Sequence, residues 1–124
     1  MIHVEQLWNT ATAVATTAVI TSKPISMLNN RGFCSMLIIL AGATPEVDIA
    51  WKCGMSDTGT FYAPIDGVGT DISAVYSALD ATKWIQFDPV VAPWIQITIT
   101  GTAGNGANTT VKAYLMWQEE IFPT

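Results

Sequence analysis

Apolar and polar side chains alternate along much of this 124-residue chain. In the clearest stretch, residues 46–53, every second position is apolar: Val47, Ile49, Trp51 and Cys53. A period of two places the apolar side chains on one face of a β-strand, whereas a helix needs a period of about 3.6 residues. The pattern therefore predicts strands with one buried face and one face in water.

The segment before this strand predicts a hairpin. The run Phe33–Ala41 is nearly continuously apolar, and residues 42–45, Gly-Ala-Thr-Pro, are typical of a turn. Pairing the two strands across this turn aligns their apolar faces and sets Cys34 directly opposite Cys53. A slip by one residue would turn the apolar side chains of one strand toward solvent, so the apolar pattern favours this register.

The C-terminal part of the chain alternates in the same way on both sides of a glycine- and asparagine-rich loop, residues 101–108. Pairing the two flanking strands as a hairpin sets Ile95 opposite Leu115 and matches their apolar faces. On the other face of the pair, three side chains form a candidate contact patch: Trp94, Tyr114 and Met116.

Other short segments rich in β-branched or aromatic residues predict four further strands: Ala11–Thr21, Pro24–Leu28, Thr60–Ala63 and Lys83–Phe87. The total is seven or eight strands. Residues 71–80 favour a short helix or helical turn, because their apolar side chains fall on one face. Residues 1–10 form either a first strand or an N-terminal arm. We therefore expect one all-β domain over residues 1–124, a sandwich of two antiparallel sheets.

Charged residues make up 12% of the chain and apolar residues 50%, against about 25% and 45–50% in an ordinary globular domain. A surface so poor in charge is typical of one that faces another protein. Ten acidic residues against five basic ones argue against a nucleic-acid partner. No apolar run is long enough to span a bilayer, and no secretion signal is recognised, so neither a membrane partner nor export is expected.

Enzymatic chemistry is not expected. The chain has one histidine, His3, with no second candidate base near it, so we predict an exposed terminal side chain. Cys34 and Cys53 are too few for a zinc site. Buried free thiols are the favoured interpretation of this pair, and a cross-strand disulfide is the alternative. Two cysteines also make no disulfide framework, which favours a reducing compartment.

Three aspartates lie in glycine-containing loops: Asp57, Asp66 and Asp71. Carboxylates and backbone carbonyls could bind calcium there, but the spacing does not match an EF-hand. Tight turns require the same residue types, so we interpret these aspartates as turn residues. No metal or cofactor site is predicted.

Five tryptophans remain to be explained. Trp51 and Trp117 lie on predicted core faces, and the other three are candidates for exposure. Exposed tryptophans serve as anchors at protein interfaces, and stacking on sugars is the alternative. The candidate interface residues are therefore Trp8, Trp84, Trp94, Tyr114 and Met116.

Residues 92–102 (Ala-Pro-Trp-Ile-Gln-Ile-Thr-Ile-Thr-Gly-Thr) and 108–115 (Asn-Thr-Thr-Val-Lys-Ala-Tyr-Leu) resemble small β-sandwich virion proteins of tailed bacteriophages. The segment Ser26–Met36 is similar in layout, and the resemblance covers about residues 20–118. It implies a jelly-roll-like or immunoglobulin-like sandwich and carries over no catalytic residue.

The resemblance also implies a function. Such chains serve as capsid decoration or cement proteins, which bind the outer capsid surface and bridge coat subunits. The implied partners are the major capsid protein and further copies of the chain, as a dimer or trimer, with assembly in the host cytoplasm. The alternative is a tail or fibre component that recognises a host or binds carbohydrate.

Overall fold

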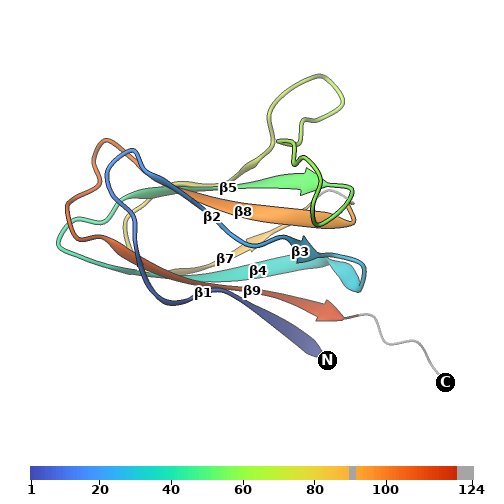
Figure 1. Ribbon diagram of the computed structural model, residues 1–124, viewed down its shortest axis with the longest axis horizontal. Coiled ribbons are helices and arrows are strands. Elements are labelled where there is room, and N and C mark those ends of the chain that lie inside the picture. The colour runs from blue at the N-terminus through green and yellow to red at the C-terminus, as the bar shows by residue number, and fades with distance from the viewer. Residues whose placement is uncertain (90–91, 120–124) are drawn as a thin grey trace.

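The computed structural model describes residues 1–89 and 92–119, and all regular secondary structure within them is β-strand. The strands are β1 (Ile2–Ala13), β2 (Val19–Thr21), β3 (Ile25–Ser26), β4 (Asn30–Ala41), β5 (Val47–Gly54), β6 (Ala74–Leu79), β7 (Lys83–Phe87), β8 (Trp94–Gly101) and β9 (Thr110–Glu119). They form two sheets packed face to face (Figure 1). The predicted all-β sandwich is confirmed, with nine strands rather than seven or eight.

The strand order identifies the type of sandwich. The first sheet has the order β1-β9-β4-β7, and the second has β2-β8-β5-β6, with β3 pairing farther along β8. All pairings between these strands are antiparallel, and they nest from the chain ends inward: β1 with β9, β2 and β3 with β8, β4 with β7, and β5 with β6. This nesting is the double Greek key of a jelly roll; the immunoglobulin sandwich groups its strands differently.

Both predicted hairpins are wrong. β4 and β5 lie in different sheets, as do β8 and β9, so each connection crosses the sandwich. β4 pairs with β9 and β7, and β5 pairs with β8 and β6. Cys34 therefore pairs with Trp117, and Cys53 pairs with Ile95. A hairpin within one sheet and a crossing between two sheets both bring apolar faces to one core, so the alternation alone did not distinguish them.

Local predictions failed where tertiary pairing dominates. Residues 74–79 of the predicted helical segment form strand β6, which pairs with β5 and is held there by the Ala78 backbone N–H, which donates to Asp48 Oδ1 at 2.8 Å. The predicted strand Ala11–Thr21 is divided between β1 and β2 as the chain crosses between sheets. Residues 60–63 make one isolated bridge, between Tyr62 and Cys53.

Two further local predictions concern residues 1–10 and residues 24–28. The opening segment is a strand and not an arm, because β1 extends along most of β9. The predicted strand Pro24–Leu28 shrinks to the two residues of β3.

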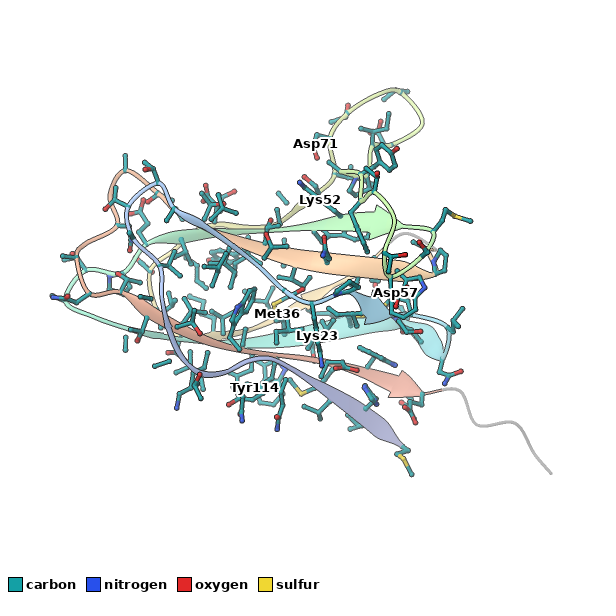
Figure 2. All side chains as sticks on the ribbon, in the orientation of Figure 1. Lys23, Met36, Lys52, Asp57, Asp71 and Tyr114 are labelled. Carbon is teal, nitrogen blue, oxygen red and sulfur yellow. The ribbon has the colours of Figure 1, made fainter. Side chains whose placement is uncertain are left out.

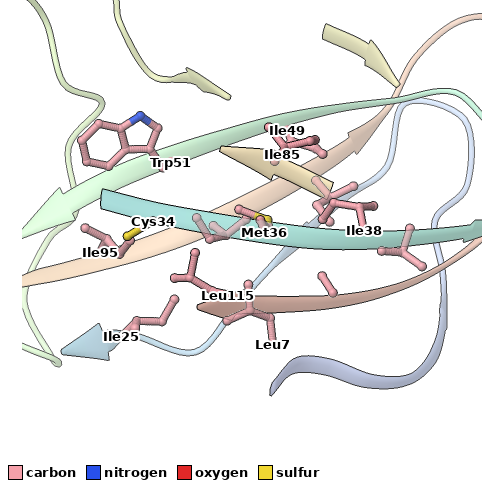
Figure 3. Packing of buried hydrophobic residues seen from close by; sticks show 14 of the residues in the cluster. Leu7, Ile25, Cys34, Met36, Ile38, Ile49, Trp51, Ile85, Ile95 and Leu115 are labelled. Atoms are coloured by element: carbon pink, nitrogen blue, oxygen red, sulfur yellow. The ribbon is translucent and has the colours of Figure 1, made fainter. Parts of the chain in front are cut away.

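The core lies between the two sheets and follows the alternation of the central strands. In β8, Ile95, Ile97 and Ile99 are fully buried. Figure 3 shows Met36 and Leu115 of the first sheet within the same cluster as Ile95 of the second. Because inward residues are apolar at every second position, the register that buries them also determines which side chains point outward.

One buried amide joins three connections at one end of the sandwich. The side chain of Asn105, in the loop between β8 and β9, donates to the Val14 carbonyl at 2.9 Å. Its Oδ1 accepts from the Glu46 backbone N–H at 3.0 Å and from the Thr109 hydroxyl at 2.7 Å. Gly101 lies against this amide, with no room for a side chain beside the Ala15 carbonyl.

Candidate interaction surface

The outer face of the first sheet is the surface that points away from the core. In its central strand β9, Val111, Ala113, Leu115 and Trp117 are buried, so the residues between them project outward. Figure 2 shows Tyr114 on this side of the molecule, with Asp71 on the opposite side. The pairing of β9 with β1 and β4 then determines which outward side chains are neighbours.

Outward residues line up in rows across the four strands. The central row consists of Gln6, Tyr114, Leu37 and Trp84. The next row consists of Val4, Met116, Ser35 and Gln86. The full set, called the outer face below, is Ile2, Val4, Gln6, Phe33, Ser35, Leu37, Ile39, Trp84, Gln86, Lys112, Tyr114, Met116 and Gln118.

The outer face is mostly apolar, and its side chains are exposed or partly exposed. Ile2 is 69% exposed, Phe33 65% and Trp84 64%. Lys112 is the one charged side chain among the residues that define the face, and the exposed Asp88 follows directly on its edge strand β7. Scattered exposed apolar residues are normal on a protein, but a continuous apolar patch of this kind is typical of an interaction surface.

Two aromatic side chains of the outer face are held by hydrogen bonds. The Trp84 indole donates to Ser35 Oγ at 3.1 Å, and the Tyr114 hydroxyl donates to Asn9 Oδ1 at 3.2 Å. A hollow of about 340 Å³ lies between Ile2, Phe33 and Met116. The face therefore offers both fixed aromatic projections and a recess.

The structure unites three of the five predicted interface residues. Trp84, Tyr114 and Met116 all lie on the outer face. Trp94 lies in β8, and because Ile95 beside it points into the core, Trp94 points to the outer side of the second sheet. The predicted contact between Trp94 and Met116 is therefore wrong. Trp8 follows an irregularity in the pairing of β1 and packs partly buried against the core.

Five apolar residues of the outer face were missed by the sequence analysis: Ile2, Val4, Phe33, Leu37 and Ile39. Three of them, Phe33, Leu37 and Ile39, had a signal in the sequence. The run Phe33–Ala41 is apolar at odd and even positions alike, and such a run is typical of a strand covered on both faces. One face of β4 is covered by the core, so the pattern indicates that something also covers the other.

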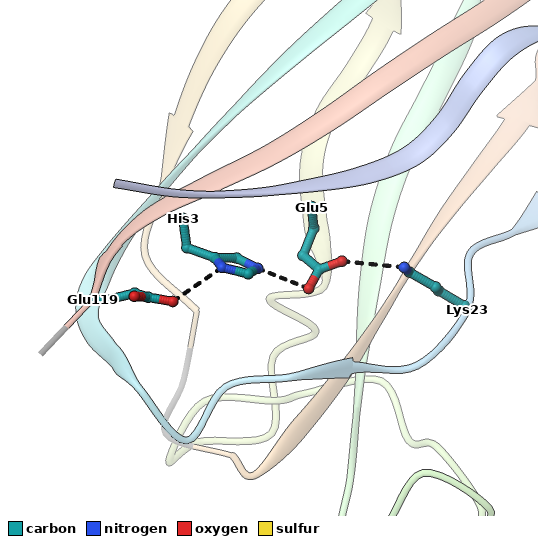
Figure 4. Close-up of polar contacts among 4 residues, drawn as sticks. All are labelled: His3, Glu5, Lys23 and Glu119. Atoms are coloured by element: carbon teal, nitrogen blue, oxygen red, sulfur yellow. Dashed lines mark hydrogen bonds and ion pairs between the residues drawn. The ribbon is translucent and has the colours of Figure 1, made fainter. Parts of the chain in front are cut away.

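An ionic network holds the start of β1. His3 Nε2 lies 2.8 Å from Glu5 Oε1, His3 Nδ1 lies 3.0 Å from Glu119 Oε1, and Lys23 Nζ lies 3.2 Å from Glu5 Oε2 (Figure 4). The His3 ring also packs on Trp117, with centroids 4.5 Å apart. His3 is therefore not the free terminal side chain predicted. The network links β1 to β9 and to the segment before β3, which fixes the edge of the outer face.

The groups around Glu5 counteract the effect of burial on its pKa. Burial would raise the pKa of Glu5, but hydrogen bonds from His3 and Lys23, with the positive charge of Lys23, outweigh it and lower the pKa below its ordinary value. The carboxylate therefore stays ionised at neutral pH and keeps both contacts.

The two cysteines are free and lie in opposite sheets. Burial raises the pKa of Cys34 to about 11, although the Asn30 amide donates to its sulfur at 3.1 Å. Burial also raises the pKa of Cys53. Both groups are therefore protonated thiols at neutral pH, the less nucleophilic form.

The loop between β5 and β6 carries the three aspartates considered for calcium, and it projects beyond the second sheet (Figure 1). Asp66 Oδ1 accepts from the backbone N–H of Val68 and of Thr70, both at 2.9 Å, and Asp71 Oδ1 accepts from Ser73 at 2.7 Å. These hydrogen bonds lower the pKa of both carboxyls. Within the described residues, no three His, Cys, Asp or Glu side chains gather as metal ligands do.

A second apolar hollow, of about 630 Å³, lies at the base of this loop. Its lining includes Cys53, Met55, Tyr62, Ile65 and Pro93. The described part of the chain has no helix able to cross a membrane.

No protein-family model matches the sequence, and no curated protein matches it. Among solved structures, a chain in the structure of infectious bursal disease virus, Gx strain, is similar, with a TM-score of 0.48 and 10% sequence identity. The match covers 94% of this chain and 31% of that chain, so this chain spans less than a third of it. At this level the similarity concerns the fold and supports no conclusion about function.

Proposed function

We propose that this chain is a structural, non-enzymatic protein of a virus particle, specifically a decoration protein on the outer capsid surface of a tailed bacteriophage. The observation that carries the proposal is the outer face of the first sheet, an exposed apolar surface with Lys112 as its one described charge. A protein that functions alone in water has no use for such a face, whereas an assembly buries it.

The size of the face suits an assembly. Four strands spaced about 4.8 Å apart, which average about ten residues at about 3.3 Å per residue, give a footprint of about 600 Å². This approaches the 800 Å² or so that each partner buries in a stable protein interface. The charge-poor composition of the chain agrees with extensive contact in the particle.

A decoration protein stabilises a capsid by bridging. When one unit contacts two coat subunits, a contact that breaks re-forms readily because the other still holds the unit in place, so two weak contacts together bind strongly. The mechanism requires apolar area and shape complementarity, and it requires no catalytic group. The implied partners are the major capsid protein and further copies of this chain.

The test mixes the purified chain with capsids of its own virus from which accessory proteins have been stripped. Saturable co-sedimentation at a fixed ratio to coat subunits, with a raised capsid disruption temperature, is the expected result. Failure to bind any form of the capsid would refute the decoration role.

Carbohydrate recognition by a tail or fibre component is the alternative. That reading requires an open tryptophan beside Asp or Asn side chains. Trp84 is open, but its neighbours on the outer face are Leu37 and Gln86. Trp84→Ala should therefore leave the binding of the chain to host-surface glycans unchanged; loss of glycan binding with assembly intact would favour the alternative.

A further inference from the structure

The outer face of the first sheet needs a partner before any particle is available. Val4 is half exposed, and Ile2, Phe33 and Trp84 are more so. In a free chain, the apolar part of a face of about 600 Å² is an aggregation hazard unless a closed contact covers it. The question is which molecule provides that contact.

The geometry points to a second copy of this chain, whose outer face packs on the first in a two-fold dimer. This inference names the partner of the surface on which the proposed function rests. A two-fold contact uses the same patch on both copies and closes, so it leaves no apolar edge for further growth. Two sheets can pack in this way about 10 Å apart with their strands within about 30° of each other, as in β-sandwiches generally.

Charge favours this partner. The chain carries a net charge of −5, and the residues that define the outer face include no carboxylate, although the exposed Asp88 follows directly on its edge strand β7. Asp48 lies in the second sheet, while Asp57, Asp66 and Asp71 lie in the loop that projects beyond it. Contact between two copies through that side would oppose acidic groups. Contact through the outer faces opposes surfaces with Lys112 as their one charged defining residue, and it holds the acidic second sheets and their loops apart.

The layout of the face fits a buried centre and a polar rim. The central row contributes Tyr114, Leu37 and Trp84, and two of these are fixed by hydrogen bonds within the chain. Lys112 pairs with Ile39, near the end of the sheet. Its ammonium can reach solvent at the rim while its aliphatic stem packs. Aromatic anchors at the centre with a charge at the edge are typical of stable interfaces.

A dimer of this kind is bivalent. Each copy keeps its second sheet and its projecting loop on the far side from the two-fold contact. Those loops expose Met55, at 83%, and Val68, at 88%. One dimer therefore presents two identical ends, each with exposed apolar side chains beside the acidic ones, and bridging of two coat subunits requires such a pair of equivalent ends.

The experiment is sedimentation velocity of the full chain at micromolar concentration. The wild type should sediment as a dimer. Leu37→Asp places a charge in the central row and should weaken the dimer at least about a hundredfold, to a monomer, because the charge is buried without a partner. Thr21→Asp introduces the same charge on an exposed position of the second sheet and should leave the dimer intact. Far-UV circular dichroism checks the fold of each variant.

Trp84→Asp gives a second perturbation at a residue that is already 64% exposed, so it should dissociate the dimer without unfolding the chain. A monomeric or trimeric wild type would overturn the inference, as would dissociation by Thr21→Asp or a dimer that survives both outer-face variants. Capsid co-sedimentation separates this inference from the proposed function. A dimer that binds no capsid refutes the function alone, and a monomer that binds capsids refutes the dimer alone.

Discussion

Asn105→Ala tests the claim that one buried amide holds three connections of the jelly roll together. Asn105 is 5% exposed, and its side chain contacts the crossing after β1, the entry to β5 and the start of β9. Alanine removes the hydrogen bond that the amide donates and the two that its Oδ1 accepts, while leaving the backbone of the loop unchanged. A change at one residue therefore affects segments that are far apart in sequence.

The expected cost follows from counting the groups left without partners. The Val14 carbonyl and the Glu46 backbone N–H each lose their contact with the amide. The Thr109 hydroxyl does not, because the Gly106 carbonyl lies 3.2 Å away and can accept in its place. Two orphaned backbone groups at about 1 to 1.5 kcal/mol each give a destabilisation of about 2 to 3 kcal/mol.

Urea unfolding followed by tryptophan fluorescence measures this cost, at one protein concentration for all variants because a dimer makes stability depend on concentration. Asn29→Ala makes the same chemical change at an exposed position and should cost less than about 0.5 kcal/mol. If Asn105→Ala costs no more than Asn29→Ala, the amide does not stabilise the crossings and the reasoning fails.

Three further predictions concern other parts of the chain. Gly101→Ala should destabilise the chain by about 3 kcal/mol or more, because the new methyl group would clash with the Ala15 carbonyl. Gly67→Ala meets open space and should be neutral. Equal unfolding midpoints for the two variants would contradict this prediction. Because the folded-state pKa of Glu5 is lowered, its contribution is present at neutral pH and disappears as pH falls below 4.5. Glu5→Gln should therefore cost up to about 1 kcal/mol at neutral pH and progressively less in acid, and a cost independent of pH would exclude the ionic network as its source. Mass analysis without reductant should find Cys34 and Cys53 both free, with Cys34 alkylated only on unfolding; a disulfide between them would contradict the separation of the two sheets.

The sequence predicts where the strands of this fold lie better than it predicts which strands pair. The alternation at Val47, Ile49 and Trp51 located β5 correctly, because the period of two is a property of the strand itself. It did not reveal the neighbours of that strand. Ile49 meets the core equally well whether β4 lies beside β5 or faces it across the sandwich, and only the pairing of distant strands decides between these arrangements.

The candidate surface was predictable in part for the same reason. Tyr114 and Met116 are outward in any arrangement in which Leu115 is buried, so their exposure followed from the local pattern. Which residues surround them did not follow from the local pattern. Val4 and Trp84 reach the same face only through pairings between the two ends and the middle of the chain. His3 likewise meets Glu119 across more than a hundred residues, which no local pattern predicts.

The nested pairing of the jelly roll also constrains how the chain reaches its native state. β9 lies between β1 and β4, and β8 lies between the β2/β3 edge and β5, so the last two strands occupy interior positions in both sheets. Until β8 and β9 emerge from the ribosome, β1 has no partner in its sheet, and each sheet lacks one of its interior strands. Folding should thus be slow and largely post-translational, as expected when most contacts join residues distant in sequence. A stall before residue 94 would leave unpaired strand edges, which are prone to aggregation.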